Sequence, residues 1–109
     1  MKLSATALIA LAILPFLAGC GGSAAHSSSP GAKVFASAGC GSCHTLADAG
    51  TNGKVGPVLD QAKPALSLAV LRVTHGQGAM PDFTGTLTKK QIADVAAYVV
   101  KASGGNPNG

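Results

Sequence analysis

Apolar side chains recur at helical spacing near the end of the chain. They form one stripe with a period of 3.6 residues, made of Ile92, Val95, Ala96 and Val99. Thr88 precedes this stripe and Gln91 follows Thr88 by three residues, which is the capping-box pattern of a helix start. Ser103 and Gly104-Gly105 mark its end. We therefore expect a helix from Thr88 to Ser103, followed by a frayed tail at residues 106–109.

Two earlier segments are also predicted to be helical. Ser29-Pro30 supplies an N-cap and a proline at the first helical position, which predicts a helix to about Ala38. Pro64 opens another segment, which runs to about Thr74 and stops at Gly76. Its apolar stripe consists of Leu66, Ala69, Val70 and Val73. No stretch shows sustained alternation of period two, so the pattern predicts an all-α fold of three or more helices.

The N-terminus has the features of an export signal. Met1-Lys2 is a positive start, and the apolar stretch from Ala7 to Leu14 is shorter than the roughly 20 residues that span a bilayer. Leu17-Ala18-Gly19-Cys20 resembles the lipobox of bacterial lipoproteins, whose processing adds diacylglycerol to the cysteine and cleaves before it. We expect a signal peptide at residues 1–19 and lipid on Cys20. The alternative is an ordinary cleaved signal that leaves a free thiol.

The segment after Cys20 is rich in glycine and serine, so we expect residues 20–29 to be the lipidated cysteine and a flexible linker. The folded domain then occupies residues 30–105. These features predict an exported protein, anchored by its lipid to the outer face of the cytoplasmic membrane or facing the periplasm. Stable anchoring needs two or more acyl chains, which lipoprotein processing supplies.

The domain has little aromatic side-chain volume. Beyond the signal, its large rings are Phe35, Phe83 and Tyr98, and the chain has no tryptophan. A domain of this size usually needs a metal, disulfides or another staple, and a large flat cofactor would fill the missing volume. The net charge is +4, with no run of lysine or arginine and no alternation of basic and aromatic residues. Nucleic-acid binding is therefore not supported.

Cys40-Gly41-Ser42-Cys43-His44 matches the C-x-x-C-H pattern of covalent haem attachment. Two cysteines three residues apart can each form a thioether to a porphyrin vinyl group, and the following histidine then lies under the iron. The pattern predicts one haem c per chain, with His44 as the proximal iron ligand. Covalent attachment suits an exported protein, because a dissociable cofactor would be lost by dilution.

Other uses of the same cysteines stay open. A zinc site needs four ligands, and beyond adjacent Cys43 and His44 only His75 could help. A thioredoxin-like dithiol is a better rival, although such pairs normally follow a strand and this one follows a predicted helix. A short structural disulfide between Cys40 and Cys43 is a third possibility.

Met80 is the candidate for the second axial ligand. It lies in Gly76-Gln77-Gly78-Ala79-Met80-Pro81, between glycines that allow close backbone approach and a proline that fixes the chain. A methionine is often only a gap filler in a core. With the attachment motif present, His/Met ligation is the expected pairing, and it raises the reduction potential. His75 is the alternative ligand, and its other interpretation is a solvated histidine at a helix end.

From about Pro30 to Ala102 the chain resembles the short bacterial class I cytochromes c, close to the c6 and related monohaem types. The matching residues are Gly31 with Phe35, Cys40-x-x-Cys43-His44, Gly56-Pro57-Val58-Leu59, Gly76-x-Gly78-x-Met80-Pro81, and Leu87-Thr88 leading to Gln91, Ile92, Ala97 and Tyr98. The resemblance implies a small cytochrome c fold, with three or more helices around one covalently bound haem.

The resemblance also implies roles for individual residues. The carbonyl of Pro57 would accept a hydrogen bond from the proximal imidazole and fix its orientation, unless Pro57 is a plain turn residue. Gly31 and Phe35 would pack against the last helix near Tyr98. The tryptophan that contacts a haem propionate in many mitochondrial-type relatives has no counterpart here that the sequence identifies.

These features predict a single-electron carrier, because an iron with both axial positions filled has no open site for substrate. We expect no enzymatic activity, and a monomer that docks transiently on redox proteins in the same membrane. A quinol-oxidising complex upstream and a terminal oxidase or reductase downstream are partners of this kind. Rival functions are a gas-binding sensor or small peroxidase, which needs Met80 absent or labile, and a thiol oxidoreductase.

Overall fold

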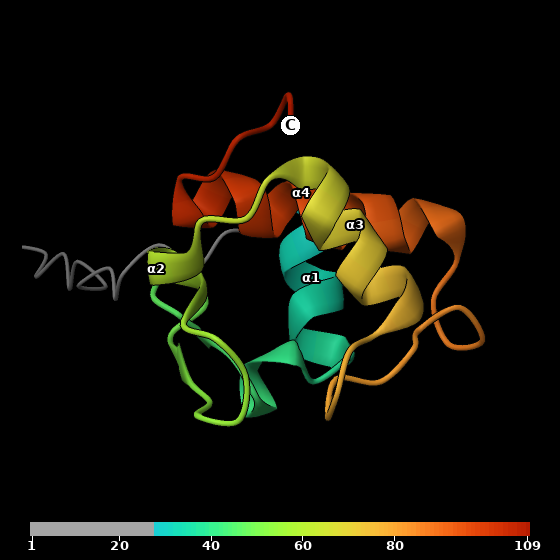
Figure 1. Ribbon diagram of the computed structural model, residues 1–109, viewed down its shortest axis with the longest axis horizontal. Coiled ribbons are helices and arrows are strands. Elements are labelled where there is room, and N and C mark those ends of the chain that lie inside the picture. Colours follow the sequence, from blue (N-terminus) through green and yellow to red (C-terminus); the bar gives the residue numbers. More distant parts are fainter. Residues whose placement is uncertain (1–27) are drawn as a thin grey trace, which may run out of the picture.

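Helices dominate the part of the chain that the structure describes, which is residues 28–109 of a computed structural model. In chain order the elements are α1 (Pro30–Ser37), a 3-10 turn η1 (Cys40–Ser42), β1 (Thr45–Leu46), β2 (Thr51–Asn52), α2 (Leu59–Ala62), α3 (Leu66–His75) and α4 (Lys89–Ser103) (Figure 1). The predicted signal peptide, Cys20 and the linker as far as residue 27 lie outside the described residues. None of the helices in residues 28–109 has the length and apolar character needed to cross a membrane.

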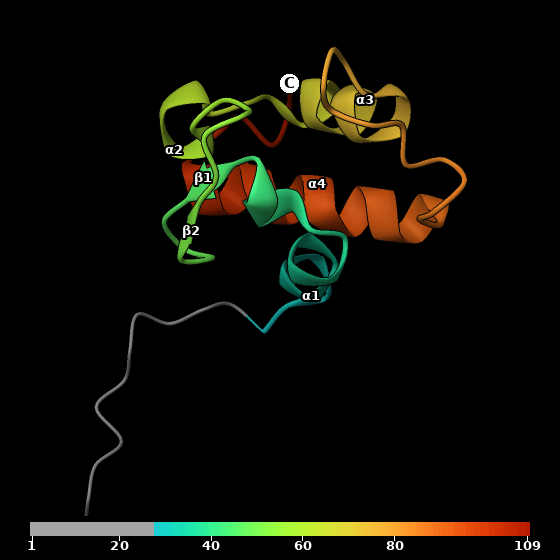
Figure 2. The ribbon, with the colours of Figure 1, turned by 90° about the horizontal axis from the view of Figure 1, so that it is seen from below.

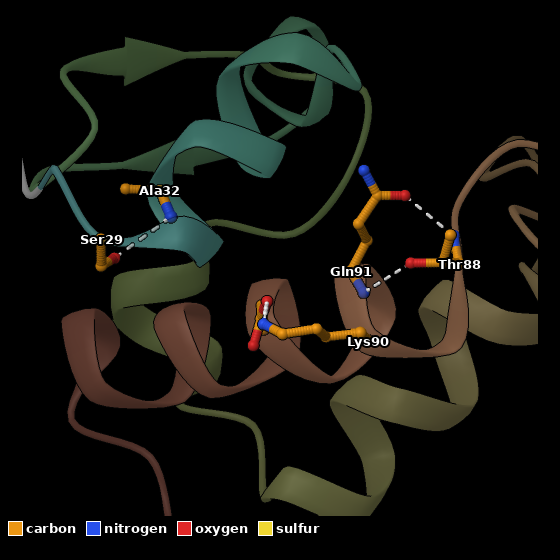
Figure 3. A network of polar contacts seen from close by, with 6 residues as sticks. Ser29, Ala32, Thr88, Lys90 and Gln91 are labelled. Atoms are coloured by element: carbon orange, nitrogen blue, oxygen red, sulfur yellow. Dashed lines mark hydrogen bonds and ion pairs between the residues drawn. The ribbon is translucent and has the colours of Figure 1, made fainter.

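The capping residues of α1 and α4 act as the sequence predicts. The backbone N–H of Ala32 donates to Ser29 Oγ at 3.3 Å and so caps α1. At α4, the N–H of Gln91 donates to Thr88 Oγ1 at 3.1 Å, and the N–H of Thr88 donates to Gln91 Oε1 at 2.9 Å (Figure 3). A cap of this kind stabilises a helix by about 1 kcal/mol. The capping box predicted for the last helix is therefore confirmed.

The first and last helices cross at very short distance. A Cβ placed on Gly31 would lie 2.0 Å from the carbonyl oxygen of Asp94 and 2.5 Å from Tyr98 Cβ, so only glycine allows this approach. One turn later, the rings of Phe35 and Tyr98 meet edge to face with centroids 5.7 Å apart. The predicted packing of Gly31 and Phe35 against the last helix is confirmed.

The core lies along α4, which is packed between α1 on one side and α3 on the other (Figure 2). Its buried apolar side chains are Val34, Phe35, Leu46, Ala69, Val73, Ile92, Val95, Ala96, Tyr98, Val99 and Val100. All four members of the predicted α4 stripe are among them. Of the α3 stripe, Ala69 and Val73 are buried, and Leu66 and Val70 pack against the core from partly buried positions. The two predicted stripes are therefore the faces that form the core.

A small antiparallel hairpin interrupts the helices, although the sequence pattern predicts no sheet. It pairs Thr45 with Asn52 and Leu46 with Thr51. Strands of two residues are too short to show an alternating pattern. The single-turn helix α2 was missed for the same reason, since four residues carry no helical period. In the described residues the fold is mostly helical, with this one small sheet. The predicted all-α fold class is therefore confirmed in its main feature.

The C-terminal residues pack against the start of α3 rather than fraying, which corrects the sequence-based expectation for residues 106–109. The N–H groups of Leu66 and Ser67 donate to the carbonyl oxygens of Asn106 and Gly109 at 2.9 and 2.8 Å. The N-cap position of α3 is Ala65, whose side chain cannot accept a hydrogen bond. The tail therefore supplies the acceptors that this helix start lacks, and Figure 1 shows the C-terminus close to α3.

Candidate functional site

A cavity of about 600 Å³ opens between α3, α4 and the segment that follows α1. All five predicted cofactor-binding residues lie on its wall: Cys40, Cys43, His44, Pro57 and Met80. Much of the remaining wall is apolar and belongs to the core, including Phe35, Val73, Val95, Ala96 and Val99. The size is typical of a site for an organic cofactor. Residues as far apart in the sequence as Phe35 and Val99 therefore meet around one apolar space.

The two cysteines are held in a tight turn directly after α1. Gly39 adopts a left-handed conformation, with φ of 75°, and redirects the chain into η1. The N–H of His44 donates to the carbonyl oxygen of Cys40 at 3.0 Å, which closes the turn over the pair. Neither Cys40 nor Cys43 is in a disulfide. The compact turn holds both thiols at the cavity wall.

The environment of Cys40 bears on the dithiol alternative. Burial raises the pKa of the Cys40 thiol, which outweighs a backbone hydrogen bond that lowers it. Redox-active dithiols instead have a cysteine with a lowered pKa in an electropositive setting. The pair also follows helix α1 rather than a strand. Both observations favour thioether formation by the two sulfurs over thiol–disulfide exchange.

The imidazole of His44 is fixed by two contacts. Its Nδ1 lies 2.8 Å from the carbonyl oxygen of Pro57. Because a carbonyl can only accept, Nδ1 carries the proton and Nε2 is the nitrogen with the lone pair for a metal. Gly56 packs against the same ring, since a Cβ at this position would lie 2.5 Å from Cε1 and 2.8 Å from Nδ1 of His44. The hydrogen bond implied for Pro57 is present.

Side chains from the small hairpin brace the backbone around His44. Thr51 Oγ1 donates to the carbonyl oxygen of His44 at 2.8 Å and accepts from the N–H of Leu46 at 3.1 Å. Farther along, the Tyr98 hydroxyl donates to Asp48 Oδ2 at 2.6 Å and ties this loop to α4. Burial and the hydrogen bond to Asp48 raise the pKa of Tyr98 above its ordinary value, so the phenol stays protonated. The loop carrying the imidazole is thus fixed to the core.

Met80 lies in a tight turn after α3. Gln77 and Met80 exchange backbone hydrogen bonds of 3.1 and 3.0 Å, which close the turn. Gly76 and Gly78 both have positive φ, and a Cβ on Gly76 would lie 2.4 Å from the carbonyl oxygen of Met80. The glycines singled out in the sequence are therefore required by this turn. Met80 is half-buried, packs against the core and lines the cavity.

Two alternatives to ligation by Met80 are His75 as the axial ligand and a zinc site. His75 is exposed at the end of α3 and is absent from the cavity wall. Within residues 28–109, no three His, Cys, Asp or Glu side chains gather where they could hold a metal ion. A tetrahedral zinc site needs four ligands. The described residues thus favour Met80 over His75 as a ligand and do not form the zinc site.

Two residues of the site are not identified by the sequence pattern, Gly56 and Arg72. Gly56 was noted only as part of a motif, and its packing against an imidazole cannot be read from one glycine beside a proline. Arg72 lines the cavity from α3 but received no role. Its spacing of four residues from Leu68, another wall residue, was the available signal, because such positions share a helix face.

The donor set of the cavity fits a haem. It offers an imidazole with one nitrogen already engaged, a thioether sulfur, two thiols at attachment spacing, and apolar walls. These are the groups that covalent attachment and His/Met axial ligation require. The core has few aromatic side chains, and the cavity beside it is large enough for an organic cofactor.

Comparison with known proteins points the same way. Residues 27–99, more than half of the chain, match the family described as "Cytochrome C oxidase, cbb3-type, subunit III". A cytochrome c6 of Picosynechococcus sp. is 38% identical, with 96% of this chain and 97% of the relative covered. A cytochrome c6 of Leptolyngbya boryana is 39% identical over 64% of this chain and 86% of the relative.

A solved structure is also similar. The c-type cytochrome SorU of Sinorhizobium meliloti superposes with a TM-score of 0.65 at 40% sequence identity, covering 72% of this chain and 93% of that one. The likeness therefore extends to fold as well as sequence. The chain belongs to the class I c-type cytochromes, and it is an electron carrier with covalently bound haem c rather than an enzyme.

Proposed function

We propose that this electron carrier holds its haem in the cavity between α3 and α4, with Cys40 and Cys43 as thioether links. His44 and Met80 are the axial ligands, and Pro57 orients the proximal imidazole. The observation that carries the proposal is the 2.8 Å contact between His44 Nδ1 and the Pro57 carbonyl oxygen, which directs the other ring nitrogen to metal binding. Met80 on the same cavity wall supports the second ligand.

A bound haem supplies the one-electron couple of its iron, and the protein controls access to it. The two axial side chains leave no position open for substrate. The apolar wall keeps most of the cavity dry, but it includes two largely exposed side chains, Val55 at 68% and Leu68 at 41%. Electrons would pass where these side chains border the cavity, through brief contacts with a partner. Small, weak interfaces are typical of such encounters.

The test is spectroscopy of the protein made in a host that attaches haem c. We expect a haem that stays with the chain under denaturing conditions and a reduced form that binds carbon monoxide slowly. His44→Ala should open the iron to carbon monoxide, whereas His75→Ala should not. Rapid carbon monoxide binding by the unaltered protein would favour a gas sensor or peroxidase. Free thiols without a haem spectrum would favour a thiol oxidoreductase.

We also propose that the carrier is exported and anchored by lipid on Cys20, with residues 1–19 as the signal peptide and residues 30–105 as the cytochrome domain. The sequence Leu17-Ala18-Gly19-Cys20 supports this assignment. Cys20→Ser should release the protein from membranes while leaving the haem spectrum unchanged. Continued sedimentation of the variant with membranes would refute lipid anchoring.

The partners we propose are membrane-bound redox complexes, a quinol-oxidising complex upstream and a terminal oxidase or reductase downstream. The family matched by residues 27–99 is named for a subunit of a cytochrome c oxidase, which supports a terminal oxidase. We infer that the carrier acts as a monomer. Membranes that hold such an oxidase should consume oxygen faster when the reduced protein is added, and sedimentation equilibrium should give the mass of one chain.

A further inference from the structure

Among residues 28–109, Arg72 is the one residue of the cavity wall that carries a fixed charge at neutral pH. The rest of the wall consists of apolar and polar residues, among them the proposed ligand His44. Arg72 lies in the last turn of α3 between Leu68 and Gly76, and it is half-buried. Its neighbours Ala69 and Val73 belong to the buried core. A guanidinium thus borders a predominantly apolar space.

Residues 28–109 provide no counter-charge for this guanidinium. In this part of the chain Lys90 pairs with Asp94 within α4, and Arg72 makes no ion pair or side-chain hydrogen bond. A charge taken partly out of water is unfavourable unless it is paired. A partner for Arg72 is therefore expected among the groups that occupy the cavity.

We propose that Arg72 pairs with a propionate carboxylate of the haem. The inference rests on the proposed haem site, because a haem is an apolar plate that carries two carboxylates. An arginine fork matches a carboxylate in shape and charge and can bind it with two hydrogen bonds. Arg72 would then fill the role for which the chain has no tryptophan. It is a positioning and tuning residue, since it touches the cofactor but not the iron.

A simpler use of Arg72 is to stabilise the negative end of the α3 dipole. The chain contains a matched case, because Lys101 lies in the last turn of α4 and is exposed away from the cavity. If the dipole were the whole explanation, removing either charge would affect helix stability alone. Only a residue that acts on the haem would also alter the reduction potential and its dependence on pH.

The expected effect on the potential has a definite sign. A neighbouring guanidinium favours the ionised carboxylate, so the pKa of the paired propionate is low. The reduction potential falls with rising pH while the propionate loses its proton, because the resulting negative charge favours the ferric iron. Without Arg72 the propionate ionises at higher pH, and the fall moves upward. We expect a displacement of about one pH unit, the lower end of the usual range, because Arg72 is only half-buried.

Other titratable groups near Arg72 must be separated from its effect on the reduction potential. Cys40, Cys43 and His44 are engaged by the haem in the proposed site. His75 follows Arg72 by about one turn. Hydrogen bonds from Thr84 lower the pKa of Asp82, and the nearby His75 adds a smaller effect in the same direction. His75→Gln should therefore leave the pH dependence in place.

The experiment is potentiometry of Arg72→Gln, Arg72→Lys, Lys101→Gln and His75→Gln holoproteins from pH 3 to pH 8, a range that includes the ionisation of an ordinary carboxyl group at about pH 4. The structure predicts that Arg72→Gln moves the fall in potential to higher pH, that Arg72→Lys restores most of the original profile, and that the other two variants match the unaltered protein. An unchanged profile in a fully haem-loaded Arg72→Gln would overturn the pairing. Failure of all variants, and of the unaltered chain, to carry haem would instead overturn the proposed site.

Discussion

Replacing Gly56 with alanine adds one methyl group against the imidazole of His44. The new Cβ would lie 2.5 Å from Cε1, 2.8 Å from Nδ1 and 3.1 Å from Nε2 of that ring. Carbon atoms in contact are normally about 3.5–4.0 Å apart, so the ring or the backbone must move by about 1 Å. Gly56 has no positive φ that would itself exclude alanine. The substitution therefore tests the contact with His44, whose ring supplies the three nearest atoms.

The size of the effect follows from the two contacts that hold the ring. A movement of about 1 Å is enough to lengthen the 2.8 Å contact with Pro57 beyond hydrogen-bonding distance. Overpacking costs about 1–3 kcal/mol, and a net hydrogen bond is worth about 0.5–1.5 kcal/mol. We expect the free energy of unfolding to fall by about 1.5–4.5 kcal/mol. The displaced ligand should also weaken axial ligation, so that the reduced protein binds carbon monoxide faster.

Gly85→Ala is the matched control, because a Cβ at Gly85 would meet no atom within 4 Å. Both substitutions reduce the freedom of the unfolded chain equally, which stabilises by about 0.4–1 kcal/mol. Urea unfolding and carbon monoxide binding of the two variants isolate the steric effect. If Gly56→Ala matched Gly85→Ala in both assays, the packing of Gly56 against His44 would not constrain the ligand.

Two further predictions concern the frame of the site. Tyr98→Phe removes the hydrogen bond to Asp48 and should lower the free energy of unfolding by about 1.5 kcal/mol, as expected for a charged acceptor. Folding raises the pKa of Tyr98, so the stabilisation from this hydrogen bond is complete below about pH 10 and is lost as the pH rises further. The free energies of urea unfolding of the two proteins should therefore converge at alkaline pH. A constant difference between them up to about pH 11 would contradict this prediction. Thr88→Ala should cost about 1 kcal/mol in thermal unfolding through loss of the α4 cap. Thr86→Ala, also exposed, serves as control, and equal melting temperatures would show that the capping box contributes nothing.

A helix was predictable where capping residues mark its start and apolar residues recur at helical spacing after them. Thr88 with Gln91 identified the start of α4, and the stripe that includes Ile92 and Val99 identified its buried face. Gly31 was predictable only through resemblance, because a single glycine does not reveal what approaches it. The cysteine pair with His44 was predictable because its chemistry depends on spacing along the chain alone.

Features made by distant backbone were not predictable. The tail at Asn106 to Gly109 caps α3 through carbonyl groups, which every residue has, so no side chain marks the contact. The hairpin at Thr45 and Thr51 is too short for a pattern. Arg72 is an ordinary residue for a helix end, and its role follows only from the cavity that tertiary packing places beside it.

The most direct test of the account is the near-infrared spectrum of the oxidised protein beside that of Met80→Ala. Ligation by Met80 predicts a weak sulfur-to-iron charge-transfer band in the unaltered protein, and its loss with a lower reduction potential in the variant. A colourless protein, or a variant whose band and potential equal those of the unaltered chain, would contradict it.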